Sequence, residues 1–556
     1  MLRRFGSLLL STSGVRWGRA APLCSQAAPL TSLQAPSEPP TSAGFSDELL
    51  GKLADGELLH AECLIGGERV STVGSRNPAE VYNPATGTTI GAVSQAGNAE
   101  ALAAIAAADS MFPIWKAIPA ADRAKILRRW HDLIIDATED LATIITMECG
   151  KPLLESKAEV ANGAASVGWM AEECRRIAGS VLEPGSRDRK MLTVKEAVGV
   201  VAAITPWNFP LSMPARKIAT ALAAGCTVVL KPSELAPLSA AALGELATRA
   251  GLPSGCLNIL FGEGEDIGNE LFAADAVRKL SFTGSVKVGK LLAEKAAHSI
   301  KRVTLELGGN APFIVFEDAD IERAARDAVR SALRNAGQTC ICANRIFVQD
   351  SLYDSFVESL SEFTRAIRIG NGLDKTVHMG PLISPERLDR VDEMVIDAVS
   401  KGALTTTGGQ RAKIPGLDNG NFYEPTVLRD ASIDMRCFRE ENFGPIIPVF
   451  KFKTEDEAIL LANKTEYGLA SYFYTSDLAR AWRVSRALEY GLVGVNEVAI
   501  TSEAAPFGGV KQSGIGREHG REGIEEYLET KYVCMGLGYS DRGFSTLRKT
   551  EEEEMD

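Results

Sequence analysis

Several features are scarce or missing in this sequence, and each absence excludes a class of protein. The ten cysteines contain no C-x-x-C pair, which excludes a zinc-finger arrangement and gives no sign of a disulfide framework or of another metal site. No window approaches the roughly 20 unbroken apolar residues that a membrane-spanning helix needs. The net charge of -12 argues against nucleic acid as the main partner, because phosphate backbones are bound by basic surfaces.

Acidic residues are nearly absent from the first 44 residues, where Glu38 is the only one. The same stretch carries four arginines and many Ser, Ala and Pro residues. An arginine-rich, acid-poor N-terminus is typical of a mitochondrial transit peptide. Residues 1–44 therefore predict import into the mitochondrial matrix, and a disordered N-terminal tail is the alternative.

Past residue 44 the sequence alternates strand-like and helix-like segments. Runs of apolar residues are separated by segments in which apolar residues recur every three or four positions. The strand-like runs are 197–204, 227–230, 257–261, 277–282, 303–307 and 312–316, and helical patterns lie at 214–224, 239–250 and 320–333. This repetition predicts a doubly wound, mostly parallel sheet and hence an α/β fold.

We divide the chain into domains where the alternation of strand-like and helix-like segments changes. Residues 45–179 with 196–309 are predicted to form a first α/β domain, and residues 310–523 a second. The segments 180–195 and 524–534 fit neither domain. Exposed strands of this kind commonly pair with another subunit, so they predict a small β oligomerisation element and a homo-oligomer. We expect a homotetramer, and a dimer is the alternative. Residues 535–556 predict a disordered acidic tail.

The stretch Ser331–Asn344, SALRNAGQTCICAN, holds Cys340 in a short connection between a predicted helix and a predicted strand at Arg345–Val348. Reactive side chains are usually held in such connections between rigid elements. Cys340 is therefore our candidate nucleophile. The alternative is a small core residue, because free cysteine is among the most buried residue types.

Two polar residues lie at predicted strand ends. Asn208 follows the strand at 197–204, where ligands of open α/β sheets collect, and its amide suits an oxyanion; a turn cap is the alternative. Glu306, between Leu305 and Leu307, should be desolvated, which raises the pKa of a carboxyl toward the range of a general base. The alternative is a strand-end carboxylate paired with Arg302.

A dinucleotide site has two candidate loops. Gly262, Gly264 and Gly268 miss the G-x-G-x-x-G spacing by one residue, so the ordinary phosphate loop is not met there. The segment Phe282–Gly289 runs from a strand end into a helix start, whose free N–H groups suit a pyrophosphate.

Seven motifs occur together: TPWNFP at 205–210, KPSE at 231–234, FTGS at 282–285, LELGG at 305–309, GQTC at 337–340, EENFGP at 440–445 and PFGGVKQSGIGRE at 506–518. Over residues 47–534 they resemble the aldehyde dehydrogenase superfamily. The resemblance implies an NAD-binding domain, a catalytic domain and a small oligomerisation element. It also implies NAD(P)-dependent oxidation of an aldehyde to an acid.

The resemblance further implies roles for single residues. Cys340 attacks the aldehyde, Asn208 holds the oxyanion and Glu306 activates water, and Lys231 is counted with this catalytic set. The residues implied to bind NAD are Thr205, Trp207, Lys231, Ser233, Glu234, Gly284, Ser285, Gly289, Glu441 and Phe443. A carboxylate at Glu234 would accept from a ribose hydroxyl and repel a 2′-phosphate, which favours NAD over NADP. No metal is implied.

Two arginines bear on the substrate. Arg216 follows Asn208 and Arg334 precedes Cys340, and guanidinium groups bind a carboxylate bidentately. These positions resemble the succinate-semialdehyde dehydrogenase branch, in which matching arginines take the substrate carboxylate. The other residues implied in substrate binding are Thr501, where that branch usually has Ser, Ser502 and Phe507.

The resemblance therefore implies oxidation of succinate semialdehyde in 4-aminobutyrate breakdown. Three alternatives stay open: arginines paired with acids away from the substrate, another branch such as a glutarate-semialdehyde or medium-chain aldehyde dehydrogenase, and a non-catalytic protein on this fold. Cys342 is either a core residue or a redox partner of Cys340, since a disulfide between the two would block the nucleophile.

Overall fold

The computed structural model describes residues 44–72, 77–185 and 188–537. The predicted transit segment, apart from Gly44, and most of the predicted acidic tail lie outside these residues. The α-helices are α1 (Asp47–Leu50), α2 (Asn98–Ala117), α3 (Ala120–Asp136), α4 (Thr138–Cys149), α5 (Leu153–Glu173), α6 (Ser212–Ala224), α7 (Leu238–Arg249), α8 (Gly264–Ala273), α9 (Val286–Ala297), α10 (Ile321–Ala332), α11 (Tyr353–Arg365), α12 (Pro385–Ser400), α13 (Arg436–Arg439), α14 (Glu455–Asn463), α15 (Leu478–Ala487) and α16 (Gly520–Glu525). Among the described residues no single helix is long and apolar enough to cross a membrane, although α2 and α3 pass that test as a pair bent by 117°.

The first sheet is doubly wound, as predicted. Its order is β19-β11-β10-β7-β8-β9-β1-β2, and the five strands from β11 to β9 run parallel. The strands are β1 (Cys63–Ile65), β2 (Glu68–Val70), β7 (Val200–Ile204), β8 (Thr227–Lys231), β9 (Leu257–Ile259), β10 (Val277–Thr283), β11 (Arg302–Glu306) and β19 (Gly514–Ile515). The chain winds from β7 to β9 in one direction and continues with β10 and β11 on the other side. The crevice between the carboxyl ends of β7 and β10 is thus where this fold class binds ligands.

A second sheet has the order β14-β15-β16-β13-β12-β17-β18, and only β14 is antiparallel. Its strands are β12 (Ala311–Val315), β13 (Ala343–Gln349), β14 (Leu404–Thr407), β15 (Thr426–Arg429), β16 (Ile446–Phe452), β17 (Ala470–Tyr474) and β18 (Leu492–Val495). The chain passes from the carboxyl end of β11 to the amino end of β12 through residues 307–310. The carboxyl edge of the first sheet is therefore linked directly to the amino edge of the second.

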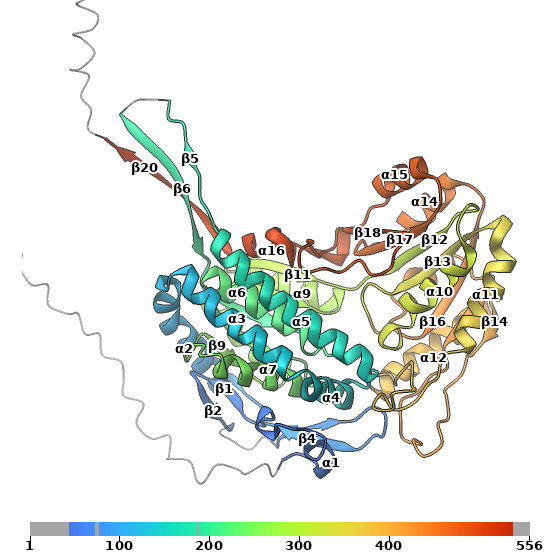
Figure 1. The fold of residues 1–556 in the computed structure, drawn as a ribbon, viewed down its shortest axis with the longest axis horizontal. Coiled ribbons are helices and arrows are strands. Elements are labelled where there is room, and N and C mark those ends of the chain that lie inside the picture. The colour runs from blue at the N-terminus through green and yellow to red at the C-terminus, as the bar shows by residue number, and fades with distance from the viewer. Residues whose placement is uncertain (1–43, 73–76, 186–187, 538–556) are drawn as a thin grey trace, which may run out of the picture. The chain divides into compact units, whose positions relative to one another are not determined.

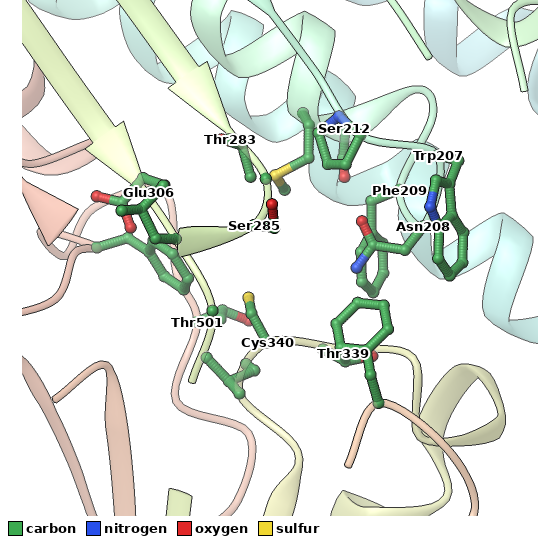
Figure 2. Close-up of a pocket in the computed structure, with 18 of the residues that line it drawn as sticks. Trp207, Asn208, Phe209, Ser212, Thr283, Ser285, Glu306, Thr339, Cys340 and Thr501 are labelled. Carbon is green, nitrogen blue, oxygen red and sulfur yellow. The ribbon is translucent and has the colours of Figure 1, made fainter. Parts of the chain in front are cut away.

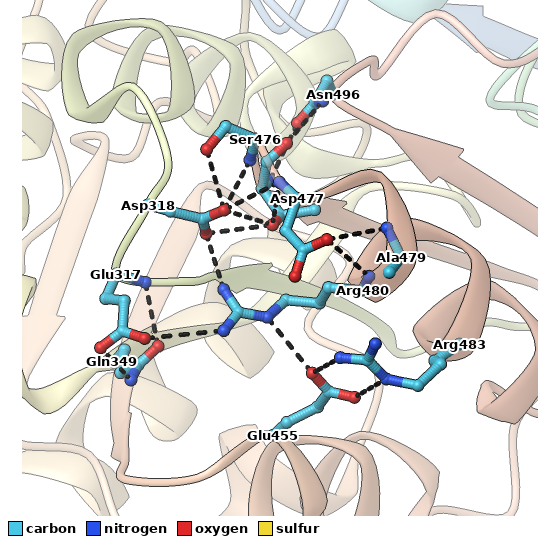
Figure 3. Close-up of polar contacts among 11 residues, drawn as sticks. Glu317, Asp318, Gln349, Glu455, Ser476, Asp477, Ala479, Arg480, Arg483 and Asn496 are labelled. Carbon is cyan, nitrogen blue, oxygen red and sulfur yellow. Dashed lines mark hydrogen bonds and ion pairs between the residues drawn. The ribbon is translucent and has the colours of Figure 1, made fainter.

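Side chains fill the corresponding crevice of the second sheet. Asp318, just past β12, accepts hydrogen bonds at Oδ2 from the backbone N–H groups of Ser476 and Asp477 and from the hydroxyl of Thr475, and its Oδ1 is 2.8 Å from Arg480 Nη1 (Figure 3). Arg480 also binds Glu455, at 3.2 Å. This network joins the loops after β12 and β17 to the start of α15, so it closes the edge that a ligand would otherwise occupy.

Strands β5 (Val181–Leu182), β6 (Arg189–Ala197) and β20 (Leu528–Gly536) form a separate three-stranded sheet, and β3 (Ala79–Tyr82) pairs with β4 (Thr89–Val93) (Figure 1). The predicted segments 180–195 and 524–534 therefore pair with each other within one chain. Strand β20 continues to Gly536, so residues 535 and 536, which the sequence assigned to the acidic tail, belong to this sheet. The antiparallel register with β6 explains this, because Met535 and Gly536 still pair with Lys190 and Arg189.

The buried residues form two hydrophobic clusters. One includes residues from Leu49 to Leu307 together with Ile524, Tyr527 and Leu528, and the other spans Ala311 to Phe507. The gap between Leu307 and Ala311 coincides with the boundary expected from the sequence. Strand β19 differs, because it lies in the segment assigned to the second domain but pairs with β11 of the first sheet. The division into domains at these residues stays a prediction.

Candidate active site

Cys340 lies where the two sheets are joined. It follows α10 and the short 3-10 turn Arg334–Gly337, and it precedes β13. Helix α10 begins at an Asp320 cap that accepts from Arg323 N, and it buries an alanine-rich face. A Cβ atom on Gly309 would lie 2.1 Å from the Cys340 carbonyl oxygen, so only glycine fits at this position. The linker between the sheets thus touches the backbone of Cys340.

The backbone before Cys340 is unusual. Asn335, Ala336 and Gly337 have φ values of 50°, 54° and 76°, and the first two are non-glycine residues in the left-handed region, which is strained for them. Surrounding contacts hold this conformation: Glu155 accepts from Asn335 N at 2.8 Å, and a Cβ atom on Gly337 would lie 2.0 Å from the carbonyl oxygen of Gly444. The loop before Cys340 is therefore packed backbone to backbone against the segment that contains Glu441 and Phe443.

A cavity of about 250 Å³ opens beside the thiol of Cys340 (Figure 2). The predicted site residues that line it are Trp207, Asn208, Arg216, Gly284, Ser285, Glu306, Arg334, Cys340, Glu441, Phe443, Thr501 and Phe507. The structure does not bring Thr205, Lys231, Ser233, Glu234, Gly289, Cys342 and Ser502 into this lining. The Ser502 hydroxyl instead accepts from Ala504 N at 3.2 Å, as in a local turn.

The thiol and the Asn208 amide face the same space (Figure 2). Asn208 Nδ2 donates to the carbonyl of Gln338 at 2.9 Å, which fixes the side chain and leaves its second N–H available. Burial raises the pKa of the Cys340 thiol, and the nearby charges of Glu441 and Glu306 raise it further, while Arg216 lowers it. The thiol is thus neutral at pH 7 and needs a proton acceptor to become a nucleophile.

Glu306 is buried at the end of β11, and neither of its carboxyl oxygens has a hydrogen-bond partner among the described residues. Desolvation raises its pKa well above the usual value, and the charge of Glu518 adds to this, whereas Lys217 and Arg216 oppose it. A buried carboxyl with a raised pKa is suited to accept a proton near neutral pH. The alternative partner, Arg302, contacts Leu528 and Glu529 instead.

The alternative from the sequence is that both arginines pair with acids away from the substrate. Arg216 and Arg334 instead both line the cavity, and only Arg216 is paired with an acid. Arg216 is paired with an acid, since its Nη1 lies 3.1 Å from Glu518 Oε2, but its guanidinium also lies 4.8 Å from the ring centre of Phe507, a residue of the lining. Arg334 lies 5.3 Å from the ring centre of Phe209. Among the residues that the structure describes, no acid lies within ion-pair distance of Arg334.

Residues 71–533 match the family described as "Aldehyde dehydrogenase family". The chain belongs to the aldehyde dehydrogenase family. The mitochondrial succinate-semialdehyde dehydrogenase of Oryza sativa subsp. japonica is 50% identical over 479 residues, which cover 86% of this chain and 90% of that one. A glutarate-semialdehyde dehydrogenase of Pseudomonas putida is 49% identical over 486 residues, 87% of this chain and 100% of that one. Among solved structures, an E. coli NADP dependent enzyme has a TM-score of 0.86 at 48% identity and covers 87% of this chain and 100% of that chain.

As an aldehyde dehydrogenase, the protein is an oxidoreductase that uses a nicotinamide cofactor. The cavity next to Cys340 fits the nicotinamide half. Gly309 N donates to Glu441 Oε1 at 2.9 Å, and burial raises the pKa of Glu441 to about 7. Trp207 and Phe443 meet edge to face with ring centres 5.6 Å apart, and they form an aromatic wall at this end.

The adenosine half fits the neighbouring strand ends of this aldehyde dehydrogenase. Ile204 of β7 pairs with Lys231 of β8 and with Phe282 of β10, so the residues after these strands share one edge. The hydroxyls of Thr205 and Thr283 are buried there without partners among the described residues. Ser285 caps α9, whose N-terminus supplies free N–H groups for a pyrophosphate.

Lys231 and Glu234 form an ion pair on this edge, at the position implied for the ribose. A Cβ atom on Gly264, the first residue of α8, would lie 4.0 Å from the Lys231 amine and from a Glu234 oxygen. The Lys231 and Glu234 side chains thus lie next to the start of α8 without crowding it. Lys231 lies outside the cavity of Cys340, which fits a role in cofactor binding better than one beside the thiol.

Sequence reasoning missed several residues of the aldehyde dehydrogenase site. Glu518 lies within a quoted motif, but its pairing with Lys217 and Arg216 depends on two segments that are distant in the sequence. Arg387 of α12 lines the cavity with its guanidinium 5.0 Å from the ring centre of Phe443, and no motif marked it. Lys151 donates to the Asn208 carbonyl at 2.6 Å.

Proposed function

We propose that this aldehyde dehydrogenase oxidises succinate semialdehyde to succinate with NAD, in the breakdown of 4-aminobutyrate. The observation that supports this substrate is the presence of Arg216 and Arg334 in the cavity of Cys340. Two guanidinium groups suit a carboxylate at the far end of the aldehyde. Thr501, which lines the same cavity, adds a hydroxyl donor.

In this proposal the Cys340 sulfur adds to the aldehyde carbon, and the thiol proton passes to Glu306, whose raised pKa suits it to that step. The second N–H of Asn208 and the backbone N–H of Cys340 hold the oxyanion that forms. When bound, the nicotinamide ring supplies the hydride acceptor. Trp207, Glu441 and Phe443 would hold that ring beside the adduct.

The loss of hydride leaves a thioester on Cys340. Glu306 first releases to solvent the proton that it took from the thiol. It then removes a proton from water, the resulting hydroxide attacks the thioester carbon, the C–S bond breaks to release the acid, and Glu306 returns the water proton to the sulfur. The balance is aldehyde, NAD⁺ and water to acid, NADH and a proton. Because Glu306 is placed to activate water, hydrolysis of the thioester is favoured over transfer of the acyl group to coenzyme A.

A panel of aldehydes tests the substrate. We expect kcat/KM for succinate semialdehyde to exceed that for hexanal, which has no carboxylate, by at least 100-fold. Glutarate semialdehyde is the second candidate, because one relative is named for it and one methylene is worth only about 1–3 kcal/mol of discrimination. Equal kcat/KM values for the charged and neutral aldehydes would refute the role of the arginines. No NADH formation with any aldehyde would favour the non-catalytic alternative.

NAD, rather than NADP, is supported by Glu234 beside the Lys231 amine. The two cofactors differ by a 2′-phosphate, which a carboxylate repels. Comparable kcat/KM values for both cofactors would contradict the preference. A Glu234→Gln variant should raise the relative activity with NADP. Glu263→Gln should not, because Glu263, which precedes α8, is not the ion-pair partner of Lys231.

Two further parts of the proposal rest on sequence patterns. The acid-poor N-terminus and the rice relative named mitochondrial support a location in the mitochondrial matrix. The exposed Val181 and Tyr532 of the three-stranded sheet support a homotetramer formed through that sheet. Import of a fusion carrying residues 1–44 and sedimentation of the purified enzyme test these two points separately.

A redox role for Cys342 stays a prediction. Cys342 is buried, and its sulfur lies 3.8 Å from the Arg334 carbonyl, while the sulfur of Cys340 faces the catalytic cavity. Burial raises the pKa of the Cys342 thiol. The two cysteines line different cavities, so at least one side chain must turn before their sulfurs can bond.

A further inference from the structure

A second, larger cavity lies behind the catalytic loop. Its volume is about 880 Å³, and its walls are mostly apolar, including Leu154, Phe363 and Val498. Cys342 lines this cavity, whereas Cys340 lines the catalytic one. The segment between Arg334 and Cys342 is thus a partition that separates two cavities.

Three residues of the partition line both cavities. They are Thr339 and Ile341, the two neighbours of Cys340, and Arg334, one of the arginines assigned above to the substrate carboxylate. A charge placed in the second cavity therefore acts on the same guanidinium that the substrate would use. The two cavities are connected through one shared cation.

The second cavity has a row of cations. Arg326, Arg330 and Arg334 all line it, and the four-residue spacing puts Arg326 and Arg330 on one face of α10, about 6 Å apart along its axis. Within the described parts of the chain, none of the three guanidinium groups makes a hydrogen bond or an ion pair; Arg326 only stacks on Phe363, with 5.4 Å to its ring centre.

The opposing charge is small. Glu155 is the one carboxylate in the described lining, and desolvation raises its pKa although the charge of Arg334 lowers it. His378 also lines the cavity, and its ring nitrogens face Arg368. Glu497 is close enough to Arg330 for their charges to interact, but it does not line the cavity. The three unpaired arginines therefore give this cavity a positive charge, although the protein as a whole has a net charge of -12.

We propose that this cavity is a second binding site for a small dianionic oxyanion, a phosphate or a dicarboxylate, and that its occupation weakens binding of the substrate carboxylate by drawing on Arg334. Guanidinium groups bind both kinds of oxyanion through paired N–H donors. The ligand-binding part is independent of the function proposed above, whereas the coupling to substrate rests on it.

Binding is tested by calorimetry on the purified full chain, with inorganic phosphate in one arm and malonate in the other, at ionic strength held constant with sodium chloride. The double variant Arg326→Gln/Arg330→Gln should bind the preferred anion at least tenfold more weakly. The matched control is Arg323→Gln on the same helix, because Arg323 is occupied by Asn496 and Asp327 and lies outside the cavity. It should bind like the parent. The unfolding temperature of each variant without anion checks the fold.

Coupling is tested by kinetics. The anion should raise KM for succinate semialdehyde at least threefold in the parent and in Arg323→Gln, leave KM for hexanal unchanged, and have no effect in the double variant. No binding by the parent, or equal binding by the double variant, overturns the site. An equal effect on hexanal overturns the link through Arg334. If the parent does not oxidise succinate semialdehyde, the proposed function fails while the calorimetric result still decides the site.

Discussion

Replacing Arg334 with glutamine should separate the recognition of the substrate from the chemistry at the thiol. The side chain lines the catalytic cavity, stacks on Phe209 and has no ion-pair partner among the described residues. Its removal therefore leaves no protein acid unpaired, unlike the removal of Arg216, which would take from Glu518 one of its two cationic partners. A hydrogen bond to a charged group contributes about 1.5–3 kcal/mol, which corresponds to roughly 10- to 150-fold in kcat/KM.

The assay is NADH formation by Arg334→Gln with succinate semialdehyde and with hexanal. We expect the loss of about 10- to 150-fold with the first substrate and less than about threefold with the second. Arg387→Gln is the matched control, because Arg387 lines the same cavity beside Phe443 and should affect both substrates alike. Equal losses of Arg334→Gln on the two aldehydes would refute the reasoning.

Three further predictions concern other residues. Glu306→Gln should slow the burst of NADH and lose roughly 100- to 10,000-fold in steady-state turnover, because Glu306 accepts the thiol proton before hydride transfer and a water proton after it. In the parent, turnover should rise with pH through the raised pKa of this acid, and a burst at the parent's rate in the variant would contradict the role of Glu306 toward the thiol. Cys342→Ala should be inactivated by peroxide less reversibly than the parent, as measured by recovery with dithiothreitol, and equal recovery would end the redox hypothesis. Asp318→Asn should lose about 1–2 kcal/mol of stability at pH 6. Burial raises the pKa of Asp318, but hydrogen bonds from Thr475 and Ser476 outweigh it and lower this pKa from 3.8 to about 2. This contribution is present above pH 3.8 and is lost as the pH falls through 2, so parent and variant should converge in acid thermal melts.

The main strands and helices could be predicted because local patterns determine them. The apolar stripe before Cys340 predicted a helix at 320–333, and α10 spans Ile321–Ala332. The family was predictable from short motifs, and the match over residues 71–533 confirms it. Each motif is contiguous in sequence, so no knowledge of the packing was needed.

Contacts between distant segments could not be read in this way. Arg216, Lys217 and Glu518 meet because β19 returns to the first sheet, although the sequence had assigned that stretch to the second domain. The short strand at Gly514–Ile515 has only two residues and carries no periodic signal. The second cavity could not be predicted either, since Arg334, Arg330 and Arg326 lie 8, 12 and 16 residues before Cys342 and line one cavity with it only in the folded chain.

The contact between Gly337 and Gly444 has a consequence for how the enzyme can vary. The segment that carries the sulfur and the segment that presents Glu441 and Phe443 touch through bare backbone, so neither can shift without displacing the other. Changes in substrate range must then come from the opposite walls, on α6 and the loop holding Thr501. Engineering that respects this division should alter which aldehyde is accepted without disturbing the alignment of thiol and nicotinamide.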